Sequence, residues 1–165
     1  MESRTFIVSL IVGILATVTM DVVAVIALRL GISSPGPRRT GPDLIGRWVG
    51  YLLQGKFRHR DILQTPPLRG ELLLGLAAHY LIGIVLTLVY LGLLVVAHAT
   101  PTALSAVLYG TATTVFPWFL MFPSQGMSWL GRAAPGDAHL ARISLFNHII
   151  FGLGIALWMA VIRPI

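Results

Sequence analysis

Long runs of apolar residues, separated by shorter polar segments, dominate the pattern along this chain. Four of these runs are long enough to cross the roughly 30 Å hydrocarbon core of a bilayer as helices that rise about 1.5 Å per residue. They predict transmembrane helices over residues 6–28, 72–97, 103–122 and 144–162. The first run is too long for a signal peptide and has no small-residue cleavage motif after it, so we expect it to be retained. The predicted fold is all-α: a polytopic membrane protein with a four-transmembrane-helix bundle, in a single domain over residues 1–165.

A shorter helical pattern lies within the first long loop. Asp43 is placed to cap a helix that runs to residue 54, and Gly55 is placed to end it. One face of this helix carries the apolar residues Leu44, Ile45, Trp48, Val49 and Leu52. The opposite face carries Asp43, Gly46, Arg47, Gly50 and Gln54. An amphipathic segment with Trp and Arg between two spans predicts a helix in the cytoplasmic membrane interface. A helix packed against the end of the bundle is the alternative.

Composition supports the membrane assignment. The chain is 56% hydrophobic and 11% charged, against roughly 25% charged in a typical soluble domain. It has no cysteine, which excludes disulfides, thiolate metal sites and cysteine nucleophiles. A net charge of +6 in a soluble protein would suggest nucleic acid. Here eight of the twelve Lys and Arg residues fall between Arg29 and Arg69, in one loop, so we expect no nucleic-acid partner.

The same cations predict the orientation in the membrane. Four spans place both chain ends on one side and the first and third loops on the other. These two loops carry ten of the twelve cations, and only Arg4 and Arg163 lie on the side of the chain ends. The positive-inside rule therefore places the two loops in the cytoplasm and both ends outside it.

Each predicted span also contains a polar residue: Asp21, His79, Thr114 and His148. Counted from the cytoplasmic ends at about 1.5 Å per residue, the first two lie roughly 10 Å deep, Thr114 about 12 Å and His148 about 6 Å. An ionised Asp at a helix centre costs roughly 2.5–3.5 kcal/mol on insertion scales. We therefore expect a partner for Asp21 from another helix, with His79 or His148 the candidates by depth. The four residues predict an intramembrane polar site, and contacts that only lock the packing are the alternative.

Small residues recur on the same helix faces as these polar ones. The four stripes are Gly13, Thr17 and Asp21; Gly75, His79 and Gly83; Ala106, Gly110, Thr114 and Pro117; and Ser144, His148, Gly152 and Ala156. Small residues four apart allow helices to approach closely, so we expect these faces to meet inside the bundle. Pro117 also leaves the carbonyl of Thr113 without its helical donor.

Charged residues at the cytoplasmic side complete the candidate chemistry. Arg69, Glu71 and Arg142 lie near the ends of spans and are expected at the mouth of the polar site. We expect contact with an anionic lipid headgroup or phosphate from Arg47, Lys56, Arg58, His59 and Arg60. Each cation near an anionic leaflet contributes on the order of 1 kcal/mol of attraction, so plain topogenic charge with general lipid contact is the alternative.

These motifs in combination resemble a domain-of-unknown-function family of small bacterial inner-membrane proteins. The matching positions are Asp21, Gly46, Arg47, Trp48, Gly55, Phe57, His59, Glu71, Gly75, His79, Tyr80, Gly83, Pro117, Pro123, Gly126, Arg142, Ser144, Leu145, His148, Phe151, Gly152 and Gly154. The resemblance spans most of the chain. It implies a bacterial inner membrane, with periplasmic termini in the orientation above, and it brings no activity, substrate or catalytic residue.

Several functions remain open at this point. The leading hypothesis is a carrier or channel-like bundle for a proton, ion or small solute, which requires a homo-oligomer because four helices enclose little space. A non-catalytic membrane assembly protein and an enzyme acting on a lipid headgroup at the cytoplasmic face are the main alternatives. A haem or quinone protein that uses His79 and His148 is a further one. No cofactor or metal site is evident, and no catalytic residue is assigned.

Overall fold

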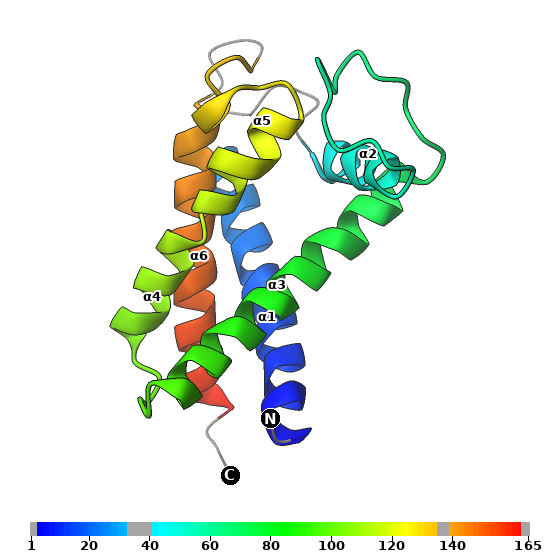
Figure 1. Ribbon diagram of the computed structural model, residues 1–165. Coiled ribbons are helices and arrows are strands. Elements are labelled where there is room, and N and C mark those ends of the chain that lie inside the picture. Colours follow the sequence, from blue (N-terminus) through cyan, green and yellow to red (C-terminus); the bar gives the residue numbers. More distant parts are fainter. Residues whose placement is uncertain (1–2, 33–40, 135–138, 163–165) are drawn as a thin grey trace. The chain divides into compact units, whose positions relative to one another are not determined.

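The computed structural model describes residues 3–32, 41–134 and 139–162. Arg38, Arg39 and Arg163, which entered the charge count above, lie outside these residues. The described residues are helical or irregular and contain no strand. Figure 1 shows the long helices α1 (Ser3–Arg29), α3 (Glu71–Val96) and α6 (Leu140–Val161), together with α4 (Ala103–Ala112), the first part of the third span. Shorter elements are α2 (Pro42–Leu52), α5 (Phe122–Ser124), a π-helical turn over Pro117–Met121 and a 3-10 turn over Trp129–Gly131.

Four segments are long and apolar enough to cross a membrane: Arg4–Arg29, Glu71–Val96, Ala103–Ser124 and Leu140–Val161. Their apolar side chains remain widely exposed, as expected for surfaces that face lipid. The prediction of a helical protein with four spans is therefore confirmed, and the protein is a multi-pass membrane protein.

The third span, expected over residues 103–122 with a missing hydrogen bond at Pro117, is not one regular α-helix. Helix α4 ends at Ala112, a turn follows at Thr113 and Thr114, and the chain continues through the π-helical turn. Pro117 has no N–H to donate to the carbonyl of Thr113, so the regular hydrogen-bond ladder is interrupted at this point. Beyond it the N–H of Phe122 donates to the carbonyl of Pro117, which sets the wider π spacing.

The chain divides into two compact units. The bundle unit comprises residues 3–30, 80–114 and 145–162, and the loop unit comprises the described residues of 31–79 and 115–144. Helices α3 and α6 each contribute one end to each unit. The single domain expected from the sequence stays a prediction.

Helices α1, α3, α4 and α6 all contribute to the core of the bundle unit. The buried residues are Val12, Ala16, Tyr90, Leu91, Ala106, Phe151 and Ile155. Two close contacts bring the predicted stripes together. A Cβ at Gly83 would meet the Thr17 hydroxyl, which places α3 against α1, and a Cβ at Gly110 would lie 2.7 Å from the Cα of Gly152, which places α4 against α6. The expectation that these faces meet is confirmed for both pairs.

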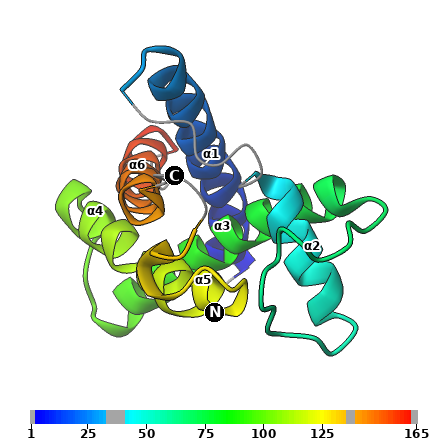
Figure 2. The same cartoon turned by 90° about the horizontal axis from the view of Figure 1, so that it is seen from above.

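The loop unit is organised by α2, which packs on the first turns of α3 (Figure 2). Gly46 and Gly75 make this contact, because a Cβ at Gly46 would meet the backbone of Glu71 and one at Gly75 that of Pro42. Gly75 therefore faces α2, and its expected place on a stripe inside the bundle is wrong. The core of the loop unit contains Leu44, Ile62, Phe122, Met127 and Leu140.

Helix α2 also buries the face that the sequence placed opposite its apolar one. Gly46, Arg47 and Gly50 are buried together with Leu44, whereas Leu52 and the following Leu53 are exposed. Because Gly46 and Gly75 have no side chains, α2 can approach α3 closely. The face of α2 that carries Gly46 is therefore buried although it is not apolar. Helix α2 therefore packs on the start of α3, and its position in the membrane interface or against the end of the bundle stays a prediction.

Candidate functional site

The carboxylate of Asp21 lies in α1 and meets a tyrosine from α3. The Tyr80 hydroxyl donates to Asp21 Oδ2 over 3.1 Å, and both side chains are half-buried. Thr17, one turn before Asp21, lies against Gly83, so the two helices are close at this level. The same close approach allows the tyrosine to reach the carboxylate inside two membrane-spanning segments.

A second polar contact lies at the break that follows α4. Nδ1 of His148 lies 2.7 Å from the hydroxyl of Thr113, and that hydroxyl donates to the carbonyl of Gly110 over 2.6 Å. Because a threonine hydroxyl has only one proton, the hydrogen bond to His148 requires Nδ1 to be the donor. With both contacts formed, Nδ1 of His148 carries a proton.

Two of these residues differ from the ones predicted. Thr114 is buried, but its hydroxyl donates to the carbonyl of Thr111 in its own helix segment over 2.6 Å, and Thr113 makes the contact with the histidine. Tyr80 was not predicted as a partner of Asp21, although it directly follows His79. His79 itself belongs to the loop unit. A single polar layer made of all four predicted residues stays a prediction.

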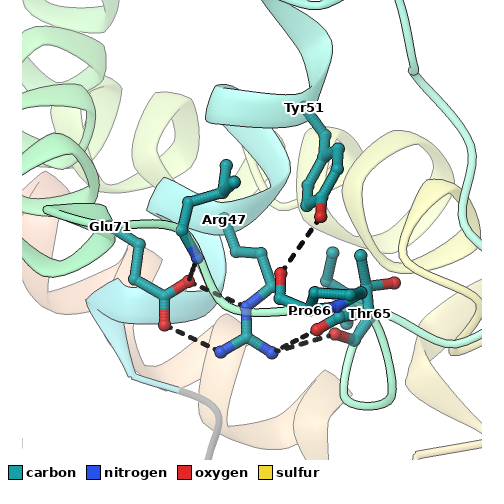
Figure 3. A network of polar contacts seen from close by, with 7 residues as sticks. Arg47, Tyr51, Thr65, Pro66 and Glu71 are labelled. Atoms are coloured by element: carbon teal, nitrogen blue, oxygen red, sulfur yellow. Dashed lines mark hydrogen bonds and ion pairs between the residues drawn. The ribbon is translucent and has the colours of Figure 1, made fainter.

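The loop unit contains an ion pair that fixes the start of α3 (Figure 3). Arg47 donates to both carboxylate oxygens of Glu71, from Nε over 2.9 Å and from Nη2 over 2.7 Å. Its Nη1 donates to the carbonyls of Ile62 and Thr65 over 3.2 and 3.1 Å. The hydrogen bond that Arg47 donates to Glu71 is the main cause that raises the pKa of Arg47 above its usual value.

These contacts define what Arg47 and Glu71 do in this fold. Four of the five guanidinium N–H donors are used within the chain. Glu71 Oε2 also accepts from the backbone N–H of Leu68 over 2.8 Å. The pair thus ties α2, the loop after it and α3 together. The headgroup contact expected of Arg47 and the site-mouth role expected of Glu71 stay predictions that these contacts do not support.

His59 is buried on the inner side of the same loop. Its Nδ1 lies 3.2 Å from the hydroxyl of Thr65, which itself donates to the carbonyl of Asp61 over 2.8 Å. By the same argument as for His148, Nδ1 is the donor. Within the described residues Nε2 has no hydrogen-bond partner. Burial, and next the charge of Lys56, lowers the pKa of His59 below its usual value.

An open cavity of about 710 Å³ lies in the same loop, lined by Lys56, Arg60, Asp61, Gln64, Thr65 and Pro66. Two of the five predicted headgroup residues, Lys56 and Arg60, thus share one cavity. Arg58, Arg69 and Arg142 are exposed and are not among its lining residues. No group of three or more His, Asp or Glu side chains that could hold a metal ion occurs among the described residues.

Comparison with known proteins identifies one family. The model of the family described as "Protein of unknown function (DUF2938)" matches residues 10–162. No curated protein and no solved structure matches the chain.

Proposed function

The chain belongs to the DUF2938 family, whose function is unknown, and we propose that it is a membrane carrier in which Asp21 takes up and releases a proton or another small cation. The contact between Asp21 and Tyr80 inside two membrane spans is the observation that supports this most. Ionisable residues in transmembrane segments are costly and mark ion or substrate pathways.

The chemistry of the pair suits reversible protonation. A charged carboxylate accepts a hydrogen bond from the Tyr80 hydroxyl, as found here. A protonated Asp21 can donate to the oxygen of the same hydroxyl, because a phenol both donates and accepts. The pair can therefore keep a hydrogen bond in both states of the carboxyl group.

The contact at the end of α4 supports the same function. His148 can exchange a proton at Nε2 while Nδ1 stays bonded to Thr113. The segment after Thr113 is an interrupted helix with a π-helical turn, and such turns often occur at functional sites. A break in a span also leaves backbone groups that can bind a permeating ion where they line a cavity.

The proposal includes a setting for this chemistry. The charge distribution and the family resemblance favour a bacterial inner membrane with periplasmic termini. A homo-oligomer supplies the enclosed path that four helices do not provide.

A packing or assembly role is the second candidate, and close helix contact favours it. A Cβ at Gly13 would lie 2.7 Å from the Cα of Ile84, so α1 and α3 approach almost backbone to backbone. In that case the bond between Asp21 and Tyr80 would only lock two helices together.

Ion flux in liposomes tests the proposal. The full chain is reconstituted into vesicles that contain a pH-sensitive or Na⁺-sensitive dye, and a potassium gradient with valinomycin sets the membrane potential. We expect faster cation entry than in empty vesicles, a return to the empty-vesicle rate for Asp21→Asn, and a severalfold reduction for Tyr80→Phe. Asp61→Asn, in the loop unit, is the control and is expected to retain the flux.

Two results would contradict carrier function. One is an unsubstituted protein that conducts neither ion faster than empty vesicles. The other is an Asp21→Asn protein that has a lower melting temperature but an unchanged flux, which is the result expected of a packing role.

A further inference from the structure

The loop that follows α2 has a polar cavity that the carrier proposal does not use. Helix α2 ends at Leu52, and Gly55 in the turn that follows has a φ of +83°, which glycine adopts readily. Lys56 donates its backbone N–H to the carbonyl of Tyr51 over 2.9 Å. This turn sends the chain back along α2 and places Lys56 and Arg60 on the lining of one cavity of about 710 Å³. The volume lies in the range of small-molecule sites in proteins.

The walls of this cavity are held in place from behind. The Lys56 ammonium lies 5.3 Å from the centre of the Tyr51 ring, whose hydroxyl donates to the carbonyl of Pro66 over 3.2 Å. Arg47 donates to the carbonyl of Thr65, and His59 donates to the Thr65 hydroxyl (Figure 3 shows the contacts of Tyr51 and Arg47). The buried side chains of Arg47 and His59 therefore hold Thr65, which lines the cavity, in place. A lining that is already ordered loses less entropy when a ligand binds.

The charge of the cavity favours an anion. Lys56 and Arg60 are exposed, and within the described part of the chain neither forms an ion pair with Asp61. The Asp61 carboxylate instead accepts from the N–H of Leu63 over 2.8 Å and from the amide of Gln64 over 2.9 Å. Two cationic residues thus line the cavity, while its one carboxylate is engaged in hydrogen bonds within the turn.

We propose that this cavity binds a phosphate group, carried either by the headgroup of an anionic lipid or by a small soluble phosphate ester. Lys56 and Arg60 provide the charge-assisted hydrogen bonds that phosphate oxygens prefer. Thr65 and Gln64 offer polar groups on the same lining. This inference is independent of the carrier proposal, since it uses no residue of the bundle unit.

Lipid binding measured by native mass spectrometry tests the inference. The delipidated full chain in neutral detergent is titrated with short-chain phosphatidylglycerol, and with diacylglycerol of the same chain length as a probe without phosphate. We expect phosphatidylglycerol to bind more tightly than diacylglycerol. We also expect Lys56→Gln with Arg60→Gln to weaken its binding at least about tenfold, because two charged contacts are lost.

A matched pair removes the same charge outside the cavity. Arg69→Gln with Arg132→Gln changes two exposed cations that do not line it, and we expect less than about a twofold effect on binding. Equal losses in both double variants would overturn the proposal in favour of general charge attraction, and unchanged binding in the cavity variant would overturn it outright. All four side chains are exposed, so thermal unfolding should be unchanged and provides the folding control.

Competition with glycerol 3-phosphate distinguishes the two sources of phosphate. Displacement of the lipid at similar concentrations supports a site for a soluble phosphate ester. Retention of the lipid supports a headgroup site that also requires the membrane-bound part of the molecule.

Discussion

The imidazole of His59 makes the loop unit sensitive to pH. The pKa of His59 in the fold lies below its ordinary value of 6.5, mainly because the ring is buried and secondly because Lys56 is near. As the pH falls, the ring in the unfolded chain therefore binds its proton at a higher pH than the ring in the folded chain does. The free energy of unfolding has its full value above pH 6.5 and decreases as the pH falls from there toward the lower pKa of the folded state.

Thermal unfolding at several pH values measures this effect. We expect the melting temperature in detergent to fall between pH 7.5 and pH 5.5, and to fall less in His59→Gln than in the unsubstituted chain. Lys56→Gln should lie between the two, because it removes the smaller of the two causes. An identical pH dependence in all three proteins would show that His59 does not titrate differently on folding.

Single residues also show where prediction from sequence was limited. The depth count placed Asp21 in a span and named His79 or His148 as its partner because they lie at a similar depth, and that pairing stays a prediction. It did not single out the Tyr80 hydroxyl, which donates to Asp21, or Thr113, which lies beside His148. In a regular helix adjacent residues point about 100° apart, so spacing gives the direction of each side chain. The helix is interrupted at Thr113, and spacing alone therefore does not give the directions of Thr113 and Thr114.

Two glycines of α3 lie in different surroundings and can show how much a close contact between helices contributes to stability. A Cβ at Gly75 would clash with the backbone of Pro42 in α2, whereas a Cβ at Gly92 would meet nothing within 4 Å. Both are helical positions where alanine has the better intrinsic propensity, by about 1 kcal/mol.

Alanine at these two positions should therefore have opposite effects. We expect Gly75→Ala to lower the melting temperature, because α2 must move away from α3 and the bond between Arg47 and Glu71 is strained. Gly92→Ala should leave it unchanged or raise it slightly. Equal melting temperatures for the two variants, measured in the same detergent, would mean that the α2–α3 contact does not contribute to stability.

The same elements show which part of the fold could be read from the sequence. Hydrophobic length predicted the four spans within a few residues, and small-residue stripes predicted the faces that carry Gly83, Gly110 and Gly152. Periodicity identifies a face but not its partner, so Gly75 was assigned to the wrong neighbour. The cavity in the loop unit lies in a segment without hydrophobic periodicity and is held by a turn and by contacts to backbone carbonyls. The only feature of the sequence that pointed to it was its two cationic residues.

For the whole molecule, the main prediction is its orientation across the membrane. Ten of the twelve cations lie in the first and third loops, which implies that these loops are cytoplasmic and that the loop after α3 is periplasmic. The chain has no cysteine, so a single introduced thiol reports its own side without background. Ala99 and Arg58 are both exposed, and the prediction places them on opposite sides of the membrane.

A membrane-impermeant maleimide applied to intact cells should label Ala99→Cys, and should label Arg58→Cys only after the inner membrane is permeabilised. The reverse pattern would invert the orientation, and labelling of both in intact cells would indicate dual insertion. The outcome also bears on the phosphate cavity, because Arg58 lies in the same loop as Lys56 and Arg60. A cytoplasmic label at Arg58 places the cavity where anionic headgroups and soluble phosphate esters are both available, whereas a periplasmic label would leave it facing away from the cell's phosphate metabolites.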